Sequence, residues 1–134
     1  MNAAVLLAED EPVSRAFLIE ALATFGLRCD AVADGLEALE QARRVRYDAL
    51  LLDLNLPGCD GIAIVQSLRA DAAAASHAVP ALALTADDTA ATRHRLLDAG
   101  FSDVACKPIA MQVLEAALQR LGLATSRPRP LAAD

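Results

Sequence analysis

Residues 47–61 decide the fold, and they read YDALLLDLNLPGCDG. The apolar run at 49–52 is typical of a strand that is buried on both faces of a parallel sheet. Asp53 follows this run directly, and a Pro-Gly pair at 57–58 then turns the chain toward an amphipathic segment. In open α/β sheets ligands bind at the carboxyl ends of the strands, so the position of Asp53 favours a functional role over a packing role.

Length and composition limit the class of protein. The chain has 134 residues, enough for one domain with a substantial core, and the scarcity of aromatic residues predicts a core of Ala, Leu and Val. A formal net charge of −6 argues against direct nucleic-acid binding, which depends on Lys and Arg clusters. Without a signal peptide or a membrane-spanning run, we expect a cytoplasmic protein with no membrane contact. We expect its three cysteines to be reduced and buried.

The rest of the chain repeats the pattern of a short apolar run followed by polar residues and an amphipathic helix. Further strands are expected at 5–8, 27–33, 81–84 and 101–106. Helices are expected to begin near Pro12, Leu36, Asp60, Thr89 and Ile109, and the one from Thr89 is expected to end at Gly100 in a left-handed cap. Five alternating pairs predict a doubly wound α/β fold, in which helices cover both faces of a five-stranded parallel sheet. We assign residues 1–123 to this domain and residues 124–134 to a disordered tail or the start of a linker.

Polar side chains follow four of the five predicted strands. Each has an ordinary explanation when taken singly, such as helix capping or a solvated surface charge. Because parallel strands end at one edge of a sheet, we expect them to converge there: Glu9, Asp10, Asp53, Thr85 and Lys107. Three carboxylates held close together repel one another unless one is protonated or a cation joins them. Mg²⁺ fits, because it takes one or two carboxylates and a backbone carbonyl and keeps several waters.

Such a site can support phosphoryl transfer to Asp53. A metal ion, the Lys107 ammonium and the Thr85 hydroxyl can neutralise the phosphoryl oxygens while the carboxylate attacks in line and forms an acyl phosphate. Aspartyl-phosphate hydrolases of the haloacid-dehalogenase class have a second Asp two residues later, as general acid and base. Asn55 occupies that position here and cannot transfer a proton, so we expect the phosphoaspartate to persist.

Four motifs, in this order and at these separations, resemble the CheY-like receiver domain of bacterial two-component response regulators. They are LLAEDEP at 6–12, LLLDLNLPGCDG at 50–61, ALTA at 83–86 and CKPI at 106–109. The resemblance covers roughly residues 3–123 and implies a flavodoxin-like (βα)5 fold with strand order 2-1-3-4-5. It also implies a signalling domain that catalyses only its own phosphorylation and dephosphorylation. Its partners would be a histidine kinase or histidine phosphotransfer protein as donor and a downstream protein as target.

The resemblance gives each converging residue a role. Asp53 would be the phospho-acceptor, and Thr85 and Lys107 would bind the phosphoryl group. The Mg²⁺ ligands would be the carboxylates of Glu9, Asp10 and Asp53 and the backbone carbonyl of Asn55. The peptide bond between Lys107 and Pro108 is typically cis in the family, so we expect it to be cis here.

Two positions depart from the family's pattern. Glu9 stands where many members have Asp, so we expect its longer side chain to reach the metal through water. Val104 stands where an aromatic ring usually accompanies switching. Three functions therefore remain: a phosphorylation-controlled domain whose last two helices and intervening strand bind a partner, a pseudo-receiver that binds partners without phosphorylation, and an aspartyl-phosphate phosphatase. Asn55 and the absence of a cap insertion speak against the phosphatase.

Overall fold

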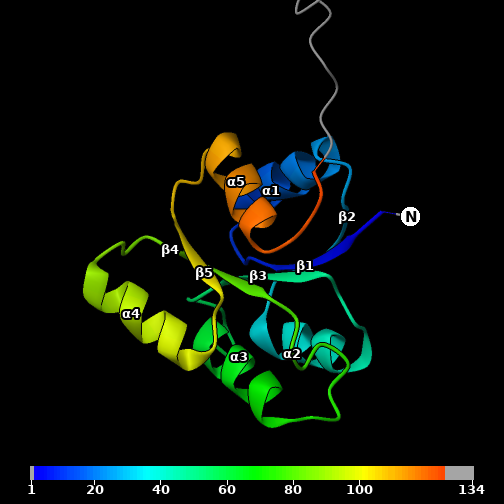
Figure 1. Ribbon diagram of the computed structural model, residues 1–134, viewed down its shortest axis with the longest axis vertical. Helices are drawn as coiled ribbons and strands as arrows, with labels where there is room; N and C mark the ends of the chain where they lie inside the picture. The colour runs from blue at the N-terminus through cyan, green and yellow to red at the C-terminus, as the bar shows by residue number, and fades with distance from the viewer. Residues whose placement is uncertain (1, 126–134) are drawn as a thin grey trace, which may run out of the picture.

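The structure is a computed structural model that describes residues 2–125, in which strands and helices alternate (Figure 1). The strands are β1 Ala4–Ala8, β2 Arg28–Val32, β3 Ala49–Asp53, β4 Ala81–Thr85 and β5 Asp103–Cys106. The helices are α1 Pro12–Thr24, α2 Gly35–Arg44, α3 Gly61–Ala70, α4 Ala90–Ala99 and α5 Met111–Arg120. All strand pairs are parallel, in the order β2-β1-β3-β4-β5. The predicted flavodoxin-like fold is confirmed. Of the predicted tail, residues 126–134 lie outside the described residues.

Helices cover both faces of the sheet, with α1 and α5 on one side and α2, α3 and α4 on the other (Figure 1). Alternate side chains of β3 enter the two cores: Leu50 and Leu52 face α2–α4, whereas Leu51 faces α1 and α5. Every residue of β3 and β4 is buried, which explains why these strands read as continuous apolar runs. No helix in the described part of the chain is long and apolar enough to cross a membrane.

Side-chain caps set where the helices begin. Asp60 accepts a hydrogen bond from the backbone N–H of Ala63 at 2.8 Å, and Thr89 accepts one from Thr92 at 3.2 Å. Helix α4 ends at Gly100, whose φ of 119° is the left-handed cap predicted from the sequence. These caps fix the loops that leave the carboxyl ends of β3 and β4.

Two sequence predictions are wrong in part. The last strand begins at Asp103 and not at Phe101, because the Phe101 N–H donates to the carbonyl of Leu96 at 3.1 Å and so completes the end of α4. The cysteines are free, as expected, but all three are partly exposed and not buried. They lie near strand ends or in the loop after β3, outside the close-packed centre of the sheet.

Candidate functional site

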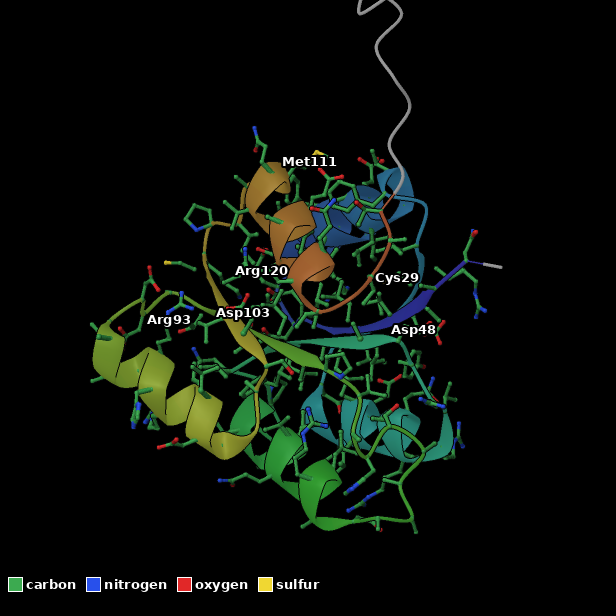
Figure 2. All side chains as sticks on the ribbon, in the orientation of Figure 1. Cys29, Asp48, Arg93, Asp103, Met111 and Arg120 are labelled. Carbon is green, nitrogen blue, oxygen red and sulfur yellow. The ribbon has the colours of Figure 1, made fainter. Side chains whose placement is uncertain are left out.

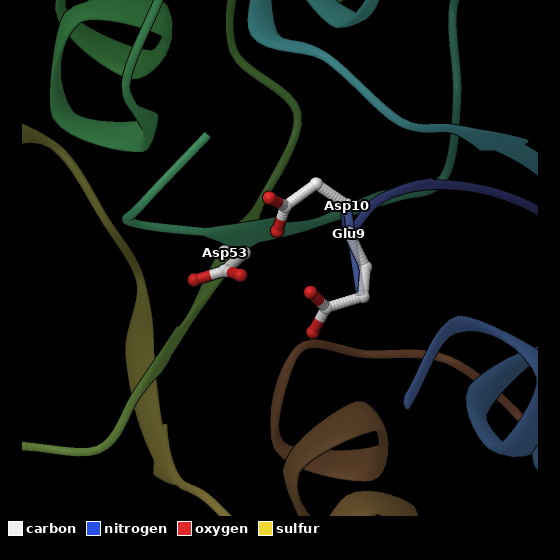
Figure 3. Close-up of side chains that lie close together, drawn as sticks. All are labelled: Glu9, Asp10 and Asp53. Atoms are coloured by element: carbon white, nitrogen blue, oxygen red, sulfur yellow. The ribbon is translucent and has the colours of Figure 1, made fainter. Parts of the chain in front are cut away.

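The predicted acidic residues meet at the carboxyl edge of the sheet (Figure 3). Glu9 and Asp10 follow the end of β1, and Asp53 is the last residue of the neighbouring strand β3. One carboxylate oxygen of each lies within 4.8 Å of the other two. Glu9 is fully buried and Asp53 nearly so, whereas Asp10 is exposed. The three carboxylates thus form an oxygen-lined site that opens to solvent on one side.

Lys107, the only lysine in the sequence, contacts both buried carboxylates. Its Nζ donates to Glu9 Oε1 at 2.7 Å and to Asp53 Oδ2 at 2.9 Å. The residue follows β5, and its peptide bond to Pro108 is cis, as predicted. One ammonium against three carboxylates leaves the site formally negative, which suits a divalent cation with oxygen ligands.

Burial and pairing act in opposite directions on the two partners of this contact. Burial raises the pKa of Glu9, and the hydrogen bonds from Lys107 and from the Glu11 N–H offset this only in part. Burial by itself lowers the pKa of Lys107, since it favours the neutral amine. The hydrogen bonds to Glu9 and Asp53 outweigh this effect, so the pKa of Lys107 is raised. The lysine therefore stays charged, and a metal ion near Glu9 would favour its ionised form.

Asn55 and Thr85 lie beside the carboxylates, along a cleft of about 650 Å³ that Asp10 also lines. The backbone N–H of Asn55 donates to Asp53 Oδ1 at 3.1 Å, which orients the carboxylate. The Thr85 side chain accepts from the backbone N–H of Asp87 at 3.0 Å. Every predicted site residue is therefore at one edge of the sheet. Lys107 touches two of the carboxylates directly, whereas Thr85 lines the cleft together with Asp10 and Asn55.

Two glycines hold the loop that carries Asn55. A Cβ atom on Gly35, the first residue of α2, would lie 1.6 Å from the carbonyl oxygen of Cys59. A Cβ on Gly61 would lie 2.7 Å from the carbonyl oxygen of Asp53. Residues 54–60 thus pack closely against the starts of α2 and α3, where a larger side chain than glycine does not fit. The sequence analysis did not predict this role of the two glycines.

Sequence reasoning missed two groups of residues around the site. Asp87 and Thr92 join the loop after β4 to α4, with Thr92 Oγ1 donating to Asp87 Oδ2 at 2.6 Å. On the other side, Val13 and Phe17 of α1 are 76% and 44% exposed and line a mostly apolar hollow of about 620 Å³ next to Lys107. The signal for the second group is that Val13 lies off the buried stripe of α1.

Comparison with known proteins places the chain in a family. The response regulator receiver domain matches residues 5–119, and the chain belongs to this family of two-component signalling domains. It is 38% identical over 104 residues to the transcriptional activator protein IrlR of Burkholderia pseudomallei. This match covers 78% of the present chain and 43% of IrlR. It is 29% identical over 114 residues to the sensor histidine kinase RcsC of Salmonella typhimurium, covering 85% of this chain and 12% of that protein.

A solved structure agrees in fold. The receiver domain of the sensor histidine kinase PA1611 from Pseudomonas aeruginosa superposes with a TM-score of 0.81 at 37% identity, covering 90% of this chain and 98% of that one. That structure has a magnesium ion coordinated in its active-site cleft. The chain spans less than half the length of the curated relatives described above. The shared unit is therefore the receiver domain itself.

Proposed function

We propose that this receiver domain accepts a phosphoryl group on Asp53 in a reaction that needs Mg²⁺. The carboxylates of Glu9, Asp10 and Asp53 and the backbone carbonyl of Asn55 would hold the ion. The observation that carries the proposal is the trio of carboxylates within 4.8 Å of one another, with a lysine ammonium on two of them. The magnesium ion of the PA1611 receiver domain supports the choice of metal. When bound, the ion supplies positive charge opposite the phosphoryl oxygens.

The protein's own groups prepare Asp53 for attack. Asn55 N–H and Lys107 Nζ each bond one oxygen of the carboxylate, which fixes its plane. A carboxylate oxygen attacks phosphorus, the bond from phosphorus to the donor breaks, and its electron pair leaves with the donor. Lys107 and the Thr85 hydroxyl then bind phosphoryl oxygens. Because Asn55 cannot act as a general base, the acyl phosphate outlasts a catalytic intermediate, and no external substrate is turned over.

We propose that the donor is a phosphohistidine on a histidine kinase or phosphotransfer protein, acting in the cytoplasm. The apolar hollow beside Lys107, with Val13, Phe17 and Ile109 in its wall, supports docking of a helical donor close to Asp53. The output would be binding of a protein partner by α4, β5 and α5, where Leu97 and Val113 are exposed. The acidic net charge disfavours direct contact with nucleic acid.

Intact mass spectrometry tests the acceptor directly. The wild-type protein is incubated with acetyl phosphate and Mg²⁺ and is expected to gain one phosphoryl group. Asp53→Asn is expected to gain none. Asp60→Asn is the matched control, because Asp60 borders the same cleft but caps α3, a task that Asn also performs. An undiminished adduct on Asp53→Asn would show that another residue is the acceptor.

A pseudo-receiver is the second candidate, and Val104 favours it. This side chain is buried in the apolar core and lacks the aromatic ring that usually accompanies switching in the family. In this candidate function the domain binds its partner without phosphorylation. Phosphorylation on Asp53 that changes neither partner affinity nor oligomeric state would favour the pseudo-receiver, whereas a change in either would exclude it.

A further inference from the structure

The hydroxyl of Thr85 is oriented by the turn that follows β4. Its oxygen accepts from the backbone N–H of Asp87 at 3.0 Å. An oxygen that accepts this bond still has its own hydrogen to donate. Thr85 is nearly buried and lines the same cleft as Asp10 and Asn55. The turn at residues 85–87 therefore presents a hydroxyl donor toward the phosphorylation site.

Asp87 is in turn fixed by helix α4. Its Oδ2 accepts from the hydroxyl of Thr92 at 2.6 Å, and its Oδ1 accepts from the backbone N–H of Thr89 at 3.0 Å. The bond from Thr92 is the main reason that the pKa of Asp87 lies below its ordinary value, so the carboxylate is charged and the bond is charge-assisted. Thr92 is buried and lies in the first turn of α4. A continuous set of hydrogen bonds thus joins the Thr85 hydroxyl to α4.

The next residue of α4 continues the connection to α5. Arg93 lies 3.4 Å from Asp103 Oδ1 on β5, and Arg120 Nε of α5 donates to Asp103 Oδ2 at 2.8 Å (Figure 2). A displacement of the first turns of α4 would therefore also act on α5. Val104, beside Asp103, is paired with Ala83 in the sheet and packs in the apolar core. Its side chain has no polar atom, but its backbone carbonyl accepts from Arg93 at 3.5 Å and so belongs to the same connection between α4 and β5.

We propose that Asp87 and Thr92 are positioning residues for Thr85 and that their hydrogen bond carries the state of the phosphorylation site to α4. The inference rests on the proposed phosphorylation of Asp53. When the Thr85 hydroxyl donates to the phosphoryl group, the Asp87 N–H follows its oxygen, and the Asp87 carboxylate transmits the shift to Thr92. The apolar core at Val104 is not needed for this coupling.

The test compares Thr92→Val, which keeps the shape but removes the hydroxyl, with Thr92→Ser, which keeps the hydroxyl. Thr24→Val is the control, because Thr24 donates to a backbone carbonyl within α1, remote from the site. Each full-length protein is treated with acetyl phosphate and Mg²⁺, and intact mass gives the occupancy of the adduct. Hydrogen exchange of the α4 amides is then compared with and without the adduct at equal occupancy.

We expect the adduct to change α4 exchange in the wild type, in Thr92→Ser and in Thr24→Val. In Thr92→Val the effect of the adduct on α4 exchange is expected to be smaller by about tenfold, because the variant loses one hydrogen bond to a charged group. Thr92→Val is also expected to phosphorylate more slowly, because Thr85 is less well held. If Thr92→Val is unstable, Asp87→Asn, which weakens the same bond, replaces it.

The outcomes separate the two proposals. A full α4 response in Thr92→Val, or its loss in Thr92→Ser as well, would overturn the positioning role. An adduct on the wild type without any α4 response would overturn it too, while leaving Asp53 as the acceptor. A wild type that takes up no phosphoryl group would overturn the proposed function, and the inference with it.

Discussion

Lys107 contacts two of the carboxylates that we propose as metal ligands. Its ammonium lies on Glu9 Oε1 and Asp53 Oδ2, so a cation that binds through these two oxygens would compete with it. The contact also keeps the buried carboxylates from repelling each other when no metal is present. On the proposed function, the lysine and the metal ion would compete before phosphorylation and would act together once a phosphoryl group adds its own negative charge.

Replacing Lys107 by Met should therefore strengthen Mg²⁺ binding while impairing phosphorylation. A hydrogen bond to a charged group contributes about 1.5–3 kcal/mol, of which water restores part, so we expect a dissociation constant lower by about tenfold. A magnesium titration measures it. Arg28→Met is the control. It removes an equal charge at the start of β2, at the edge of the sheet opposite the site, and should change the affinity little. Weaker Mg²⁺ binding by Lys107→Met would mean that the lysine organises the site and does not compete for it.

The sequence predicted individual site residues where one rule sufficed. Asp53 and Thr85 end an apolar strand and Lys107 follows one, and parallel topology brings such residues together. Asp87 and Thr92 could not be predicted in this way. Their pairing depends on how the loop after β4 enters α4, and an Asp followed five residues later by a Thr has no distinctive pattern in the sequence.

One side chain of α3, Arg69, joins this helix to two other parts of the chain. Arg69 donates to the backbone carbonyls of His77 at 2.8 Å, Val79 at 2.7 Å and Gly100 at 3.2 Å. The first two precede β4, and the third caps α4. Burial lowers the pKa of this guanidinium, but arginine stays charged in proteins. Arg69 thus holds an irregular segment and the end of α4 against α3.

Arg69→Met keeps most of the aliphatic stem but removes all three donors. We expect it to lower the free energy of unfolding by about 2–3 kcal/mol, because partly buried carbonyls lose charged partners. Urea unfolding measures the change. Arg44→Met is the control, since Arg44 forms an exposed pair with Glu40 at 3.4 Å and should cost about 0.5 kcal/mol or less. Equal effects of the two substitutions would contradict this role of Arg69.

Helix and strand positions were largely predictable, and their ends were less so. Pro12 and Gly100 bound α1 and α4 as expected, because proline at a first turn and glycine in a left-handed cap are strong local signals. The start of β5 was wrong because Phe101 is as apolar as a strand residue. The hydrogen bond from its N–H to the carbonyl of Leu96, a local bond of the helix cap, shows that it completes α4.

At the scale of the whole molecule, the burial of two weakly acidic side chains, Cys29 and Tyr47, predicts sensitivity to alkaline pH. Burial is the main cause that raises the pKa of Cys29 from 9.0 to about 11. It also raises the pKa of Tyr47, whose hydroxyl donates to Asp30 at 2.7 Å. A group whose pKa is higher in the folded state adds stability below its unfolded pKa. That stability is lost as the pH rises through the folded pKa.

The free energy of unfolding should therefore fall between pH 9 and about 11, with Cys29 responsible for about 1–2 kcal/mol of the fall. Urea unfolding across this range, in wild type and in Cys29→Val, measures its share. The variant is expected to have the shallower decline, and Cys106→Val serves as the control for cysteine replacement. Parallel declines in wild type and Cys29→Val would contradict the assignment.

The topology of the molecule followed from the sequence because strict alternation of strands and helices leaves few parallel arrangements. The strand order rested on the family resemblance, and the observed pairing of β1 with both β2 and β3 confirms it. The sequence did not predict the close packing of residues 54–60 against the start of α2. Gly35 and Cys59 are far apart in the chain and meet only through backbone atoms.

Locating the phosphoryl group tests the central proposal most directly. Protein treated with acetyl phosphate and Mg²⁺ is reduced with borohydride, which converts an aspartyl phosphate to homoserine, and the peptides are sequenced by mass spectrometry. We predict homoserine at Asp53 alone, and none when Mg²⁺ is omitted. Homoserine at another carboxylate, or equal yields with and without Mg²⁺, would contradict the roles given to Asp53 and to its acidic neighbours.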